Sequence, residues 1–176
     1  MNPSLVGSEM CIRDSLNVKY LTLFGFSSEN WKRPADEVID LMSLLRNYLS
    51  KEINDLNKKG IVFRVIGDRN RLDPDILEMI KQSEFLTKSN TELTLTLALS
   101  YGGRRAIVAA AKELASQVSR QQLKLNDINE EVFNGVLETK TCPDPDLIIR
   151  TSGEKRISNF MLWECAYSCL LYTSPS

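Results

Sequence analysis

The spacing of apolar and polar residues along the chain predicts strands and helices that alternate. Short apolar runs, or apolar residues at every second position, predict strands. Apolar residues three, four and seven positions apart predict the helices between them. The expected strands are 20–26, 61–66, 93–99 and 147–149, and the first and last of them should be buried. The expected helices are 35–59, one that begins at Asp73–Pro74, one that follows Arg105, and a polar helical piece near 127–137. This alternation predicts an α/β fold with a mostly parallel sheet flanked by helices.

The apolar stripe of helix 35–59 has two interpretations. Its Val38, Leu41, Leu45 and Leu49 follow helical spacing, which is typical of a helix that packs on a core. The same stripe would also suit one wall of an apolar tunnel. Periodicity alone does not separate the two.

Three of the connecting loops carry polar side chains and arginines: 27–33, 101–104 and 150–158. The carboxyl ends of parallel strands meet at one edge of a sheet, where α/β proteins bind their ligands. We therefore expect these loops to gather and form an anion site. Gly102–Gly103, placed before a helix, can present free backbone N–H groups to an anion, although such a turn is more often only a tight connection.

The loop after the last expected strand is the strongest candidate. Arg150 ends the strand, a turn over 151–154 follows, and Arg156 and Ser158 come next. Two guanidiniums around a glycine-containing turn suit a planar, multiply charged oxyanion, diphosphate above all. The alternative is that one arginine pairs with Glu154 and the other is solvated. The polar loops upstream favour the anion site.

Composition narrows the class of protein. The chain has 176 residues, 43% of them hydrophobic, and a net charge of −1, which predicts one soluble domain and argues against a nucleic-acid partner. It has no histidine, which excludes Ser-His-Asp and Cys-His catalysis and any histidine-bearing metal site. Its four cysteines lack paired-ligand spacing, so a reduced cytosolic protein is expected. No apolar run approaches the roughly 20 residues of a membrane span.

The two ends of the chain do not resemble protein sequence. Residues 9–15 can be encoded by GAG ATG TGT ATA AGA GAC AGN, and residues 169–174 by TGT CTC TTA TAC ACA TCT. The second string is the reverse complement of bases inside the first, as expected of translated adapter DNA. We therefore expect residues 1–15 and 168–176 to lie outside the fold. The authentic sequence would be a single, partial domain over 16–167.

Three motifs carry a resemblance to a known family. The stretches SSENWKRP (27–34), YGGR (101–104) and DLIIRTSGEKRISNFMLW (146–163) closely resemble the cis-prenyltransferases, and among them the bacterial undecaprenyl diphosphate synthases. The similarity runs in order through 16–167. It implies condensation of isopentenyl diphosphate onto an allylic diphosphate such as farnesyl diphosphate, in cis and with Mg²⁺, to make the lipid carrier for cell-wall sugars.

The resemblance also implies further properties. Members of the family are homodimers with a parallel sheet and an apolar tunnel for the growing chain, which favours the tunnel interpretation of helix 35–59. A cytoplasmic protein that contacts the membrane surface through its lipid product is expected, with no nucleic-acid partner.

The same resemblance assigns roles to individual residues. It places Arg150, Arg156 and Ser158, with Ile157 between them, at the isopentenyl diphosphate. It places Asn30 at the position of the family's proton acceptor, although a neutral amide is a poor base and positioning is the safer role. The remaining substrate contacts are expected from Ser27, Ser28, Glu29, Trp31 and Arg33. A structural role is expected for Arg104, and a pairing with an arginine for Glu154.

Several features of the family's pattern are absent. The first strand and helix, and the Asp-Gly-Asn-Gly-Arg-Trp loop with its metal-linked aspartate, have no counterpart. Cys169 stands where a metal-associated glutamate is expected, and Lys155 stands where many bacterial members have histidine. Without those carboxylates the sequence predicts no Mg²⁺ site, since a hard cation needs oxygen ligands. We therefore expect this chain to be inactive.

Three hypotheses follow from the sequence. The first is an internal fragment of an authentic synthase. The second is a non-catalytic, cis-prenyltransferase-like partner subunit, but such partners tend to lose the substrate residues of the first loop, which are intact here. The third is a generic phosphate-binding α/β domain, which would need a glycine fingerprint that is missing. The first hypothesis is favoured.

Overall fold

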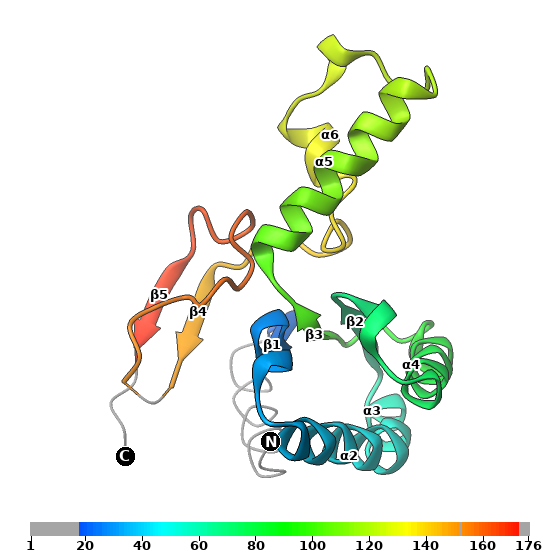
Figure 1. Cartoon of the computed structure of the whole chain (residues 1–176). Coiled ribbons are helices and arrows are strands. Elements are labelled where there is room, and N and C mark those ends of the chain that lie inside the picture. The colour runs from blue at the N-terminus through cyan, green and yellow to red at the C-terminus, as the bar shows by residue number, and fades with distance from the viewer. Residues whose placement is uncertain (1–17, 152, 173–176) are drawn as a thin grey trace. The chain divides into compact units, whose positions relative to one another are not determined.

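The computed structural model of the protein describes residues 18–151 and 153–172. These residues form two compact units that divide between Ser100 and Tyr101 (Figure 1). Each unit is described by itself. Within the described ranges, every helix is too short or too polar to serve as a membrane-spanning segment.

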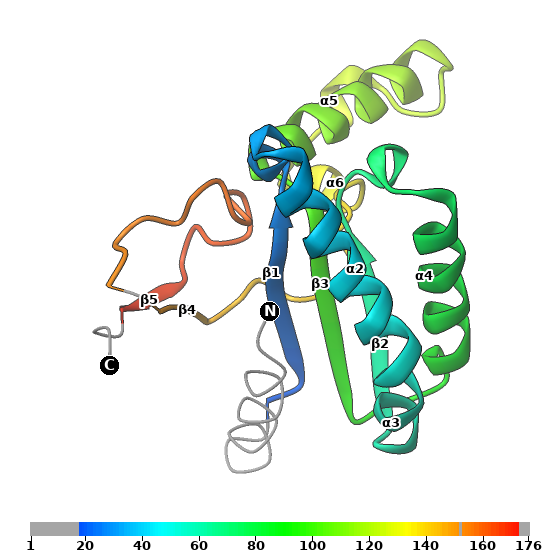
Figure 2. The ribbon, with the colours of Figure 1, turned by 60° about the horizontal axis from the view of Figure 1, so that its bottom comes forward.

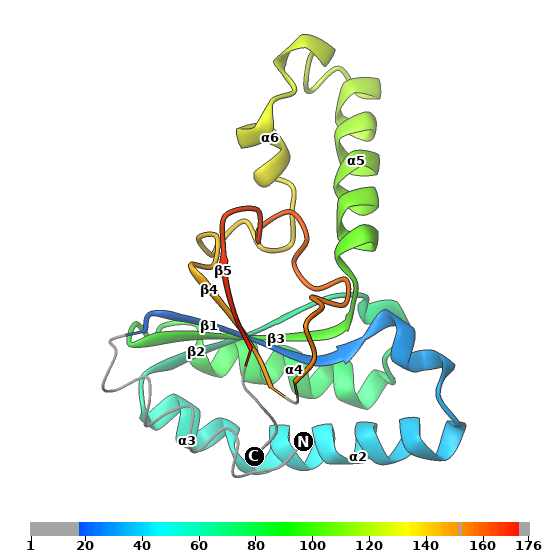
Figure 3. The same ribbon diagram turned by 90° about the vertical axis from the view of Figure 1, so that its left-hand side faces the viewer.

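The first unit is a three-stranded sheet with helices on one face (Figure 3). Its strands are β1 (Tyr20–Ser27), β2 (Ile61–Ile66) and β3 (Leu93–Tyr101), in the order β1-β3-β2 (Figure 2). Strands β2 and β3 are parallel, with Ile61 opposite Leu93 and Ile66 opposite Ala98. The covering helices are α2 (Ala35–Lys51), α3 (Ile53–Lys58) and α4 (Pro74–Thr87). Strand–helix alternation and the parallel sheet confirm the predicted fold class.

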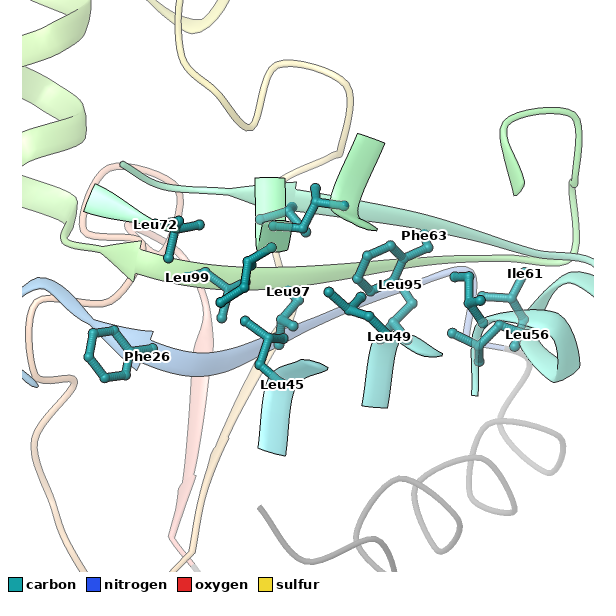
Figure 4. Packing of buried hydrophobic residues seen from close by; sticks show 14 of the residues in the cluster. Phe26, Leu45, Leu49, Leu56, Ile61, Phe63, Leu72, Leu95, Leu97 and Leu99 are labelled. Carbon is teal, nitrogen blue, oxygen red and sulfur yellow. The ribbon is translucent and has the colours of Figure 1, made fainter. Parts of the chain in front are cut away.

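Apolar side chains from the sheet and the helices meet in one core (Figure 4). Leu45 and Leu49 of α2 point toward the sheet and pack against Leu95 and Leu97 of β3. Phe63 on β2 is 1% exposed. Each side chain buried in this way contributes about 1.5–3 kcal/mol. The core thus holds the sheet whose strand ends carry the polar loops.

The predicted helix 35–59 is present as two segments. A turn at Glu52, whose N–H donates to the Tyr48 carbonyl at 2.9 Å, separates α2 from α3. The predicted stripe continues across the turn, because Ile53 and Leu56 are buried like Leu45 and Leu49. The stripe therefore packs on the core, and the tunnel interpretation stays a prediction.

Strand β1 is less buried than predicted. Only Phe26 in it is buried, and Tyr20 is 47% exposed. The reason is its place at the end of the β1-β3-β2 order, which leaves one of its sides without a neighbouring strand in the described sheet. An edge strand with one covered face buries fewer side chains than a central strand does.

At the other edge of the sheet, side chains satisfy the backbone of β2. The Phe63 N–H donates to Thr87 Oγ1 at 3.0 Å, and the Val65 N–H donates to Glu84 Oε1 at 2.9 Å. The Arg69 guanidinium donates to the Val65 carbonyl at 2.8 Å and to Glu84 at 2.7 Å. Asn90 Nδ2 donates to the Ile61 carbonyl at 2.8 Å. These contacts occupy the hydrogen-bonding groups to which another strand would pair.

The second unit contains two helices and a two-stranded sheet. Its elements are α5 (Gly103–Ser119), α6 (Glu130–Asn134), β4 (Leu147–Arg150) and β5 (Cys169–Tyr172). Strands β4 and β5 are parallel, with Leu147 opposite Cys169 and Arg150 opposite Tyr172. Helix α6 is shorter than the predicted piece over 127–137, where Leu125–Asp127 forms a separate 3-10 turn.

The prediction that 147–149 is a buried strand is wrong. Leu147 is 49% exposed and Ile149 is 58% exposed. Two strands of four residues each cannot cover their own faces, and a parallel strand is buried only where other elements cover both faces. The partner strand β5 lies in the stretch expected to be adapter-derived. Its Tyr172 favours a strand whatever the origin of the sequence, so the adapter interpretation and the limits of the domain stay predictions.

Candidate functional site

The loop after β4 is folded around the Arg150 guanidinium. Arg150 Nη1 donates to Ser158 Oγ at 2.7 Å and also to the Arg156 carbonyl. Arg156 extends outward and pairs with Glu154, with 3.2 Å between Nη2 and Oε2. The pairing expected for Glu154 is confirmed, but Arg150 is not simply solvated as the alternative required. The structure therefore brings the side chains of Arg150 and Ser158 together, whereas Arg156 contributes its backbone carbonyl and its guanidinium pairs with Glu154.

The backbone that follows is held in an uncommon conformation. Ser158, Asn159 and Met161 have φ values of 48°, 63° and 41°, in the left-handed region that side-chain-bearing residues rarely adopt. Such residues cost of order 1–3 kcal/mol each and persist only where surrounding contacts fix them. Sequence reasoning named Ser158 but missed the turn that positions it.

Those surrounding contacts come from the start of α5. The Gly103 N–H donates to the Asn159 carbonyl at 2.7 Å, and the Arg104 N–H donates to Asn159 Oδ1 at 2.9 Å. A Cβ on Gly103 would lie 2.8 Å from Leu162 Cγ and 3.1 Å from the Asn159 oxygen. The suggestion that the double glycine presents free N–H groups to an anion is therefore wrong for Gly103, because Asn159 accepts from its N–H. The alternative, a tight connection, is confirmed.

Tyr101, the residue before the double glycine, has a buried phenol ring. The Tyr101 ring is 0% exposed and meets Phe160 edge-on, with ring centroids 6.1 Å apart. Burial raises the pKa of Tyr101, and the carboxylates of Glu164 and Glu138 raise it further. Tyr101 is therefore a neutral packing group at physiological pH.

The loop after β1 is a 3-10 turn, Ser28–Lys32, closed by reciprocal hydrogen bonds. Ser27 Oγ accepts from the Asn30 N–H at 3.3 Å, and Asn30 Oδ1 accepts from the Ser27 N–H at 2.7 Å. This is a capping box. Since its amide oxygen is committed to the backbone, Asn30 shapes the loop.

Trp31 is anchored on three sides. Its indole N–H donates to Ser100 Oγ at 2.8 Å, and its ring meets Phe26 edge-on with centroids 4.9 Å apart. The guanidinium carbon of Arg71 lies 4.6 Å from the ring centroid, a cation–π distance. Sequence reasoning missed Arg71. The sequence offered one indication that Arg71 is a candidate: it lies in the turn after β2, and the other polar loops also follow strands.

Of the other members of this loop, Glu29 and Arg33 are exposed and Ser28 is partly buried. Arg33 pairs with Glu37 at 3.3 Å, and Ser28 Oγ donates to Glu29 Oε2 at 3.0 Å. Ile157 accepts from the Phe160 N–H at 3.0 Å through its carbonyl and is partly buried. Because the loop after β1 and the loop after β4 belong to different units, their meeting at one sheet edge stays a prediction.

The described residues do not fit a site for Mg²⁺. In 18–151 and 153–172 there is no group of three or more histidine, cysteine, aspartate or glutamate side chains that could hold a metal ion. The acid nearest the two arginines in sequence, Glu154, pairs with Arg156. Glu164 is 5% exposed and accepts from the Thr139 hydroxyl at 2.6 Å. Neither carboxylate is part of a cluster of oxygen ligands of the kind that a hard cation requires.

The architecture defines the class of protein. It is an α/β protein with parallel strands, whose arginines, hydroxyls and one indole lie in loops that follow strands. The family described as putative undecaprenyl diphosphate synthase matches residues 7–176. The chain therefore belongs to this prenyltransferase family, and the resemblance read from the three motifs is confirmed.

Individual relatives agree with the family. The chain is 49% identical over 158 residues to an isoprenyl transferase of Caulobacter vibrioides, covering 90% of this chain and 61% of that one. It is 46% identical over 158 residues to the ditrans,polycis-undecaprenyl-diphosphate synthase of Haemophilus influenzae, which is described as specific for (2E,6E)-farnesyl diphosphate. This match covers 90% of this chain and 66% of that one. It spans about three fifths of the length of the curated relatives it matches, for example 61% and 63%.

A solved structure shares the fold. Lavandulyl diphosphate synthase from Lavandula x intermedia, crystallised with dimethylallyl diphosphate, superposes with a TM-score of 0.88 at 34% identity. The match covers 92% of this chain and 70% of that one. The predicted cis-prenyltransferase fold is thereby confirmed.

Proposed function

We propose that this chain is part of a cis-prenyltransferase that condenses isopentenyl diphosphate with an allylic diphosphate, farnesyl diphosphate or longer. The product would be the long polyprenyl diphosphate that carries cell-wall sugars. The observation that carries the proposal is the contact between Arg150 and Ser158 in the loop after β4, which also holds Arg156 with its exposed guanidinium. The names of the relatives, one specific for farnesyl diphosphate, support the same substrate class.

Arg150, Arg156 and Ser158 are proposed to hold the diphosphate of isopentenyl diphosphate. The Arg156 side chain is 71% exposed, so an incoming diphosphate can take the place of Glu154 at little cost. Arg150 already points its guanidinium at Ser158 Oγ, which orients both groups for charge-assisted contacts. Ile157 supports this segment.

The loop after β1 is proposed to contact the allylic substrate. In the reaction the allylic C–O bond breaks as diphosphate leaves, and the isopentenyl double bond supplies the electrons of the new C–C bond. The departing diphosphate then accepts a proton from the isopentenyl unit, which forms the cis double bond. Asn30 acts as a positioning residue, because its amide oxygen is held by the Ser27 N–H. Trp31 supplies an apolar wall. The further contacts proposed are Ser27, Ser28, Glu29 and Arg33.

We propose Mg²⁺ as a cofactor of the intact enzyme and not of this chain alone. When bound, it would offset the charge of the departing diphosphate. No step is routed through it here, because the described residues offer no cluster of oxygen ligands. We propose that this chain alone is inactive for the same reason. The intact protein is proposed to be a homodimer with a product tunnel, acting in the cytoplasm at the membrane surface.

The proposal is tested by grafting residues 18–167 into the Caulobacter vibrioides relative in place of the matching stretch. With farnesyl diphosphate, labelled isopentenyl diphosphate and Mg²⁺, the chimera should make extended, labelled polyprenyl diphosphates. The matched control is the chimera with Arg150→Gln and Arg156→Gln, which should lose the product. A folded chimera that makes no product, assayed beside an active parent relative, would contradict the proposal.

A further inference from the structure

Asn159 links the diphosphate loop to helix α5 across 55 positions of sequence. Its backbone carbonyl accepts from the Gly103 N–H at 2.7 Å, and its side-chain Oδ1 accepts from the Arg104 N–H at 2.9 Å. The residue at the helix start, Gly102, makes no side-chain cap. The Asn159 side chain therefore caps the N-terminus of α5, a role that a serine or aspartate next to the helix fills in most proteins.

This contact needs both the side chain and the backbone of residue 159. A φ of 63° turns the Asn159 carbonyl toward Gly103, and asparagine tolerates that conformation better than most residues. The close approach also needs the absence of a side chain on Gly103, where a Cβ would lie 3.1 Å from the Asn159 oxygen. The cap and the left-handed turn therefore depend on each other.

The neighbour of Asn159 in the chain is Ser158, which accepts from Arg150 Nη1 at 2.7 Å. Hydrogen bonds thus tie Asn159 to the first N–H groups of α5 and tie its covalent neighbour Ser158 to the Arg150 guanidinium. The α5 helix is 17 residues long, so it is a rigid support. A side chain fixed in this way loses less entropy when it binds a ligand.

We infer that Asn159 is a positioning residue for the diphosphate site. It touches no substrate in this account. It sets the direction of Ser158 and Arg150 by tying their loop to the start of α5. The inference rests on the proposed function, because it assumes that Arg150 and Ser158 bind a diphosphate.

The test uses Asn159→Gly in the full 176-residue chain. Glycine still permits the left-handed backbone and removes the side chain that carries the Oδ1 acceptor. The matched control is Gln121→Gly, which also places glycine at a left-handed position (φ 59°) just beyond the other end of α5. We expect the Arg104 amide to lose hydrogen-exchange protection and isopentenyl diphosphate to bind about tenfold more weakly in Asn159→Gly alone.

A second variant separates positioning from general loosening of the fold. Asn159→Asp keeps an oxygen acceptor at the helix N-terminus, so the Arg150 guanidinium proton signals in NMR should return to their wild-type positions in this variant and shift in Asn159→Gly. Equal affinity and unshifted Arg150 signals in Asn159→Gly would overturn the inference and leave the proposed function intact. If the wild-type chain bound no isopentenyl diphosphate, the proposed function would fail and the inference with it.

Discussion

At the scale of single residues, two polar side chains of the loop after β1, those of Asn30 and Trp31, are held by protein partners. Asn30 is held by the Ser27 backbone, and Trp31 by Ser100, Phe26 and Arg71. Ser100 itself has a φ of 50° and is 1% exposed. Groups oriented before the ligand arrives bind it at lower entropic cost. The loop after β1 is therefore described best as a preformed surface.

Arg71→Met is predicted to change the environment of Trp31. The methionine keeps an apolar stem and removes the cation 4.6 Å from the ring centroid. Exposed cation–π pairs contribute about 0.5–1 kcal/mol, so a loss of stability in that range and a shift in Trp31 emission are expected, measured in a Trp163→Phe background.

Arg71→Lys is the matched control, because it restores a cation that can lie over the ring. It should recover most of the wild-type emission. Identical emission spectra for Arg71→Met and the wild-type chain would contradict the contact.

The sequence predicted the polar residues of the candidate loops, but it did not predict most of the side chains that they contact. Arg150, Arg156 and Ser158 do share one loop, and Glu154 does pair with an arginine. The cap by Asn159 and the cation over Trp31 were missed, because each joins segments distant in sequence. Neither helical spacing nor residue type carries information on such tertiary pairs.

At the scale of elements, the position of α4 is fixed by polar contacts as well as by the core. Arg46 on α2 donates to Asp73 at 2.6 Å and to Asp75 at 2.6 Å. Asp73 was predicted to cap α4 and does stand at the N-cap position, but its carboxylate makes no cap hydrogen bond. That carboxylate accepts from Arg46 instead. The hydrogen bond from Arg46 lowers the pKa of Asp75, so the contact between α2 and Asp75 depends on pH.

Asp75→Asn is predicted to lower stability only where Asp75 is ionised. The hydrogen bond from Arg46 lowers the pKa of Asp75 in the folded chain. A lowered folded-state pKa means a contribution that is full above the unfolded value, about 3.9, and is lost as pH falls through the folded-state value. In urea unfolding, the difference between wild type and variant should be constant from about pH 5 to 7 and shrink below about pH 4.

Asp40→Asn, an exposed acid on α2, is the control for the removal of one negative charge. It should leave the pH dependence close to that of the wild type. A difference between wild type and Asp75→Asn that did not shrink in acid would contradict the Arg46 contact.

Thr87→Val is predicted to destabilise the edge of the sheet. Thr87 is 0% exposed and accepts from the buried Phe63 N–H at 3.0 Å. Valine has nearly the same shape and no acceptor, so the N–H is left unsatisfied at a cost of about 1–3 kcal/mol. Urea unfolding should give that loss, and Thr91→Val, an exposed threonine nearby, should stay within about 0.5 kcal/mol of the wild type.

The elements themselves were largely predictable. The strand over 61–66 and the stripe of 35–59 follow simple periodicities, and both are confirmed. Burial was less predictable at 20–26 and 147–149. An apolar strand reads the same in the middle of a sheet and at its edge, and only the strand order distinguishes the two.

At the scale of the whole molecule, the chain carries the residues proposed to bind isopentenyl diphosphate but offers no cluster of metal ligands among its described residues. We predict that incubation with farnesyl diphosphate, labelled isopentenyl diphosphate and Mg²⁺ gives no extended product. Replacing Cys169 by glutamate should not restore activity by itself, because one carboxylate does not make a Mg²⁺ site. Elongation by the unmodified chain would contradict this prediction.

The most direct test of the central claim is a calorimetric titration of isopentenyl diphosphate into the 176-residue chain in the presence of a chelator. Because the proposed binding groups are guanidiniums and a hydroxyl on one loop, we predict saturable, metal-independent binding that weakens as salt is added. Arg150→Gln should abolish it. A chain that bound no isopentenyl diphosphate, or bound it only when Mg²⁺ was added, would contradict a metal-independent diphosphate site in this loop.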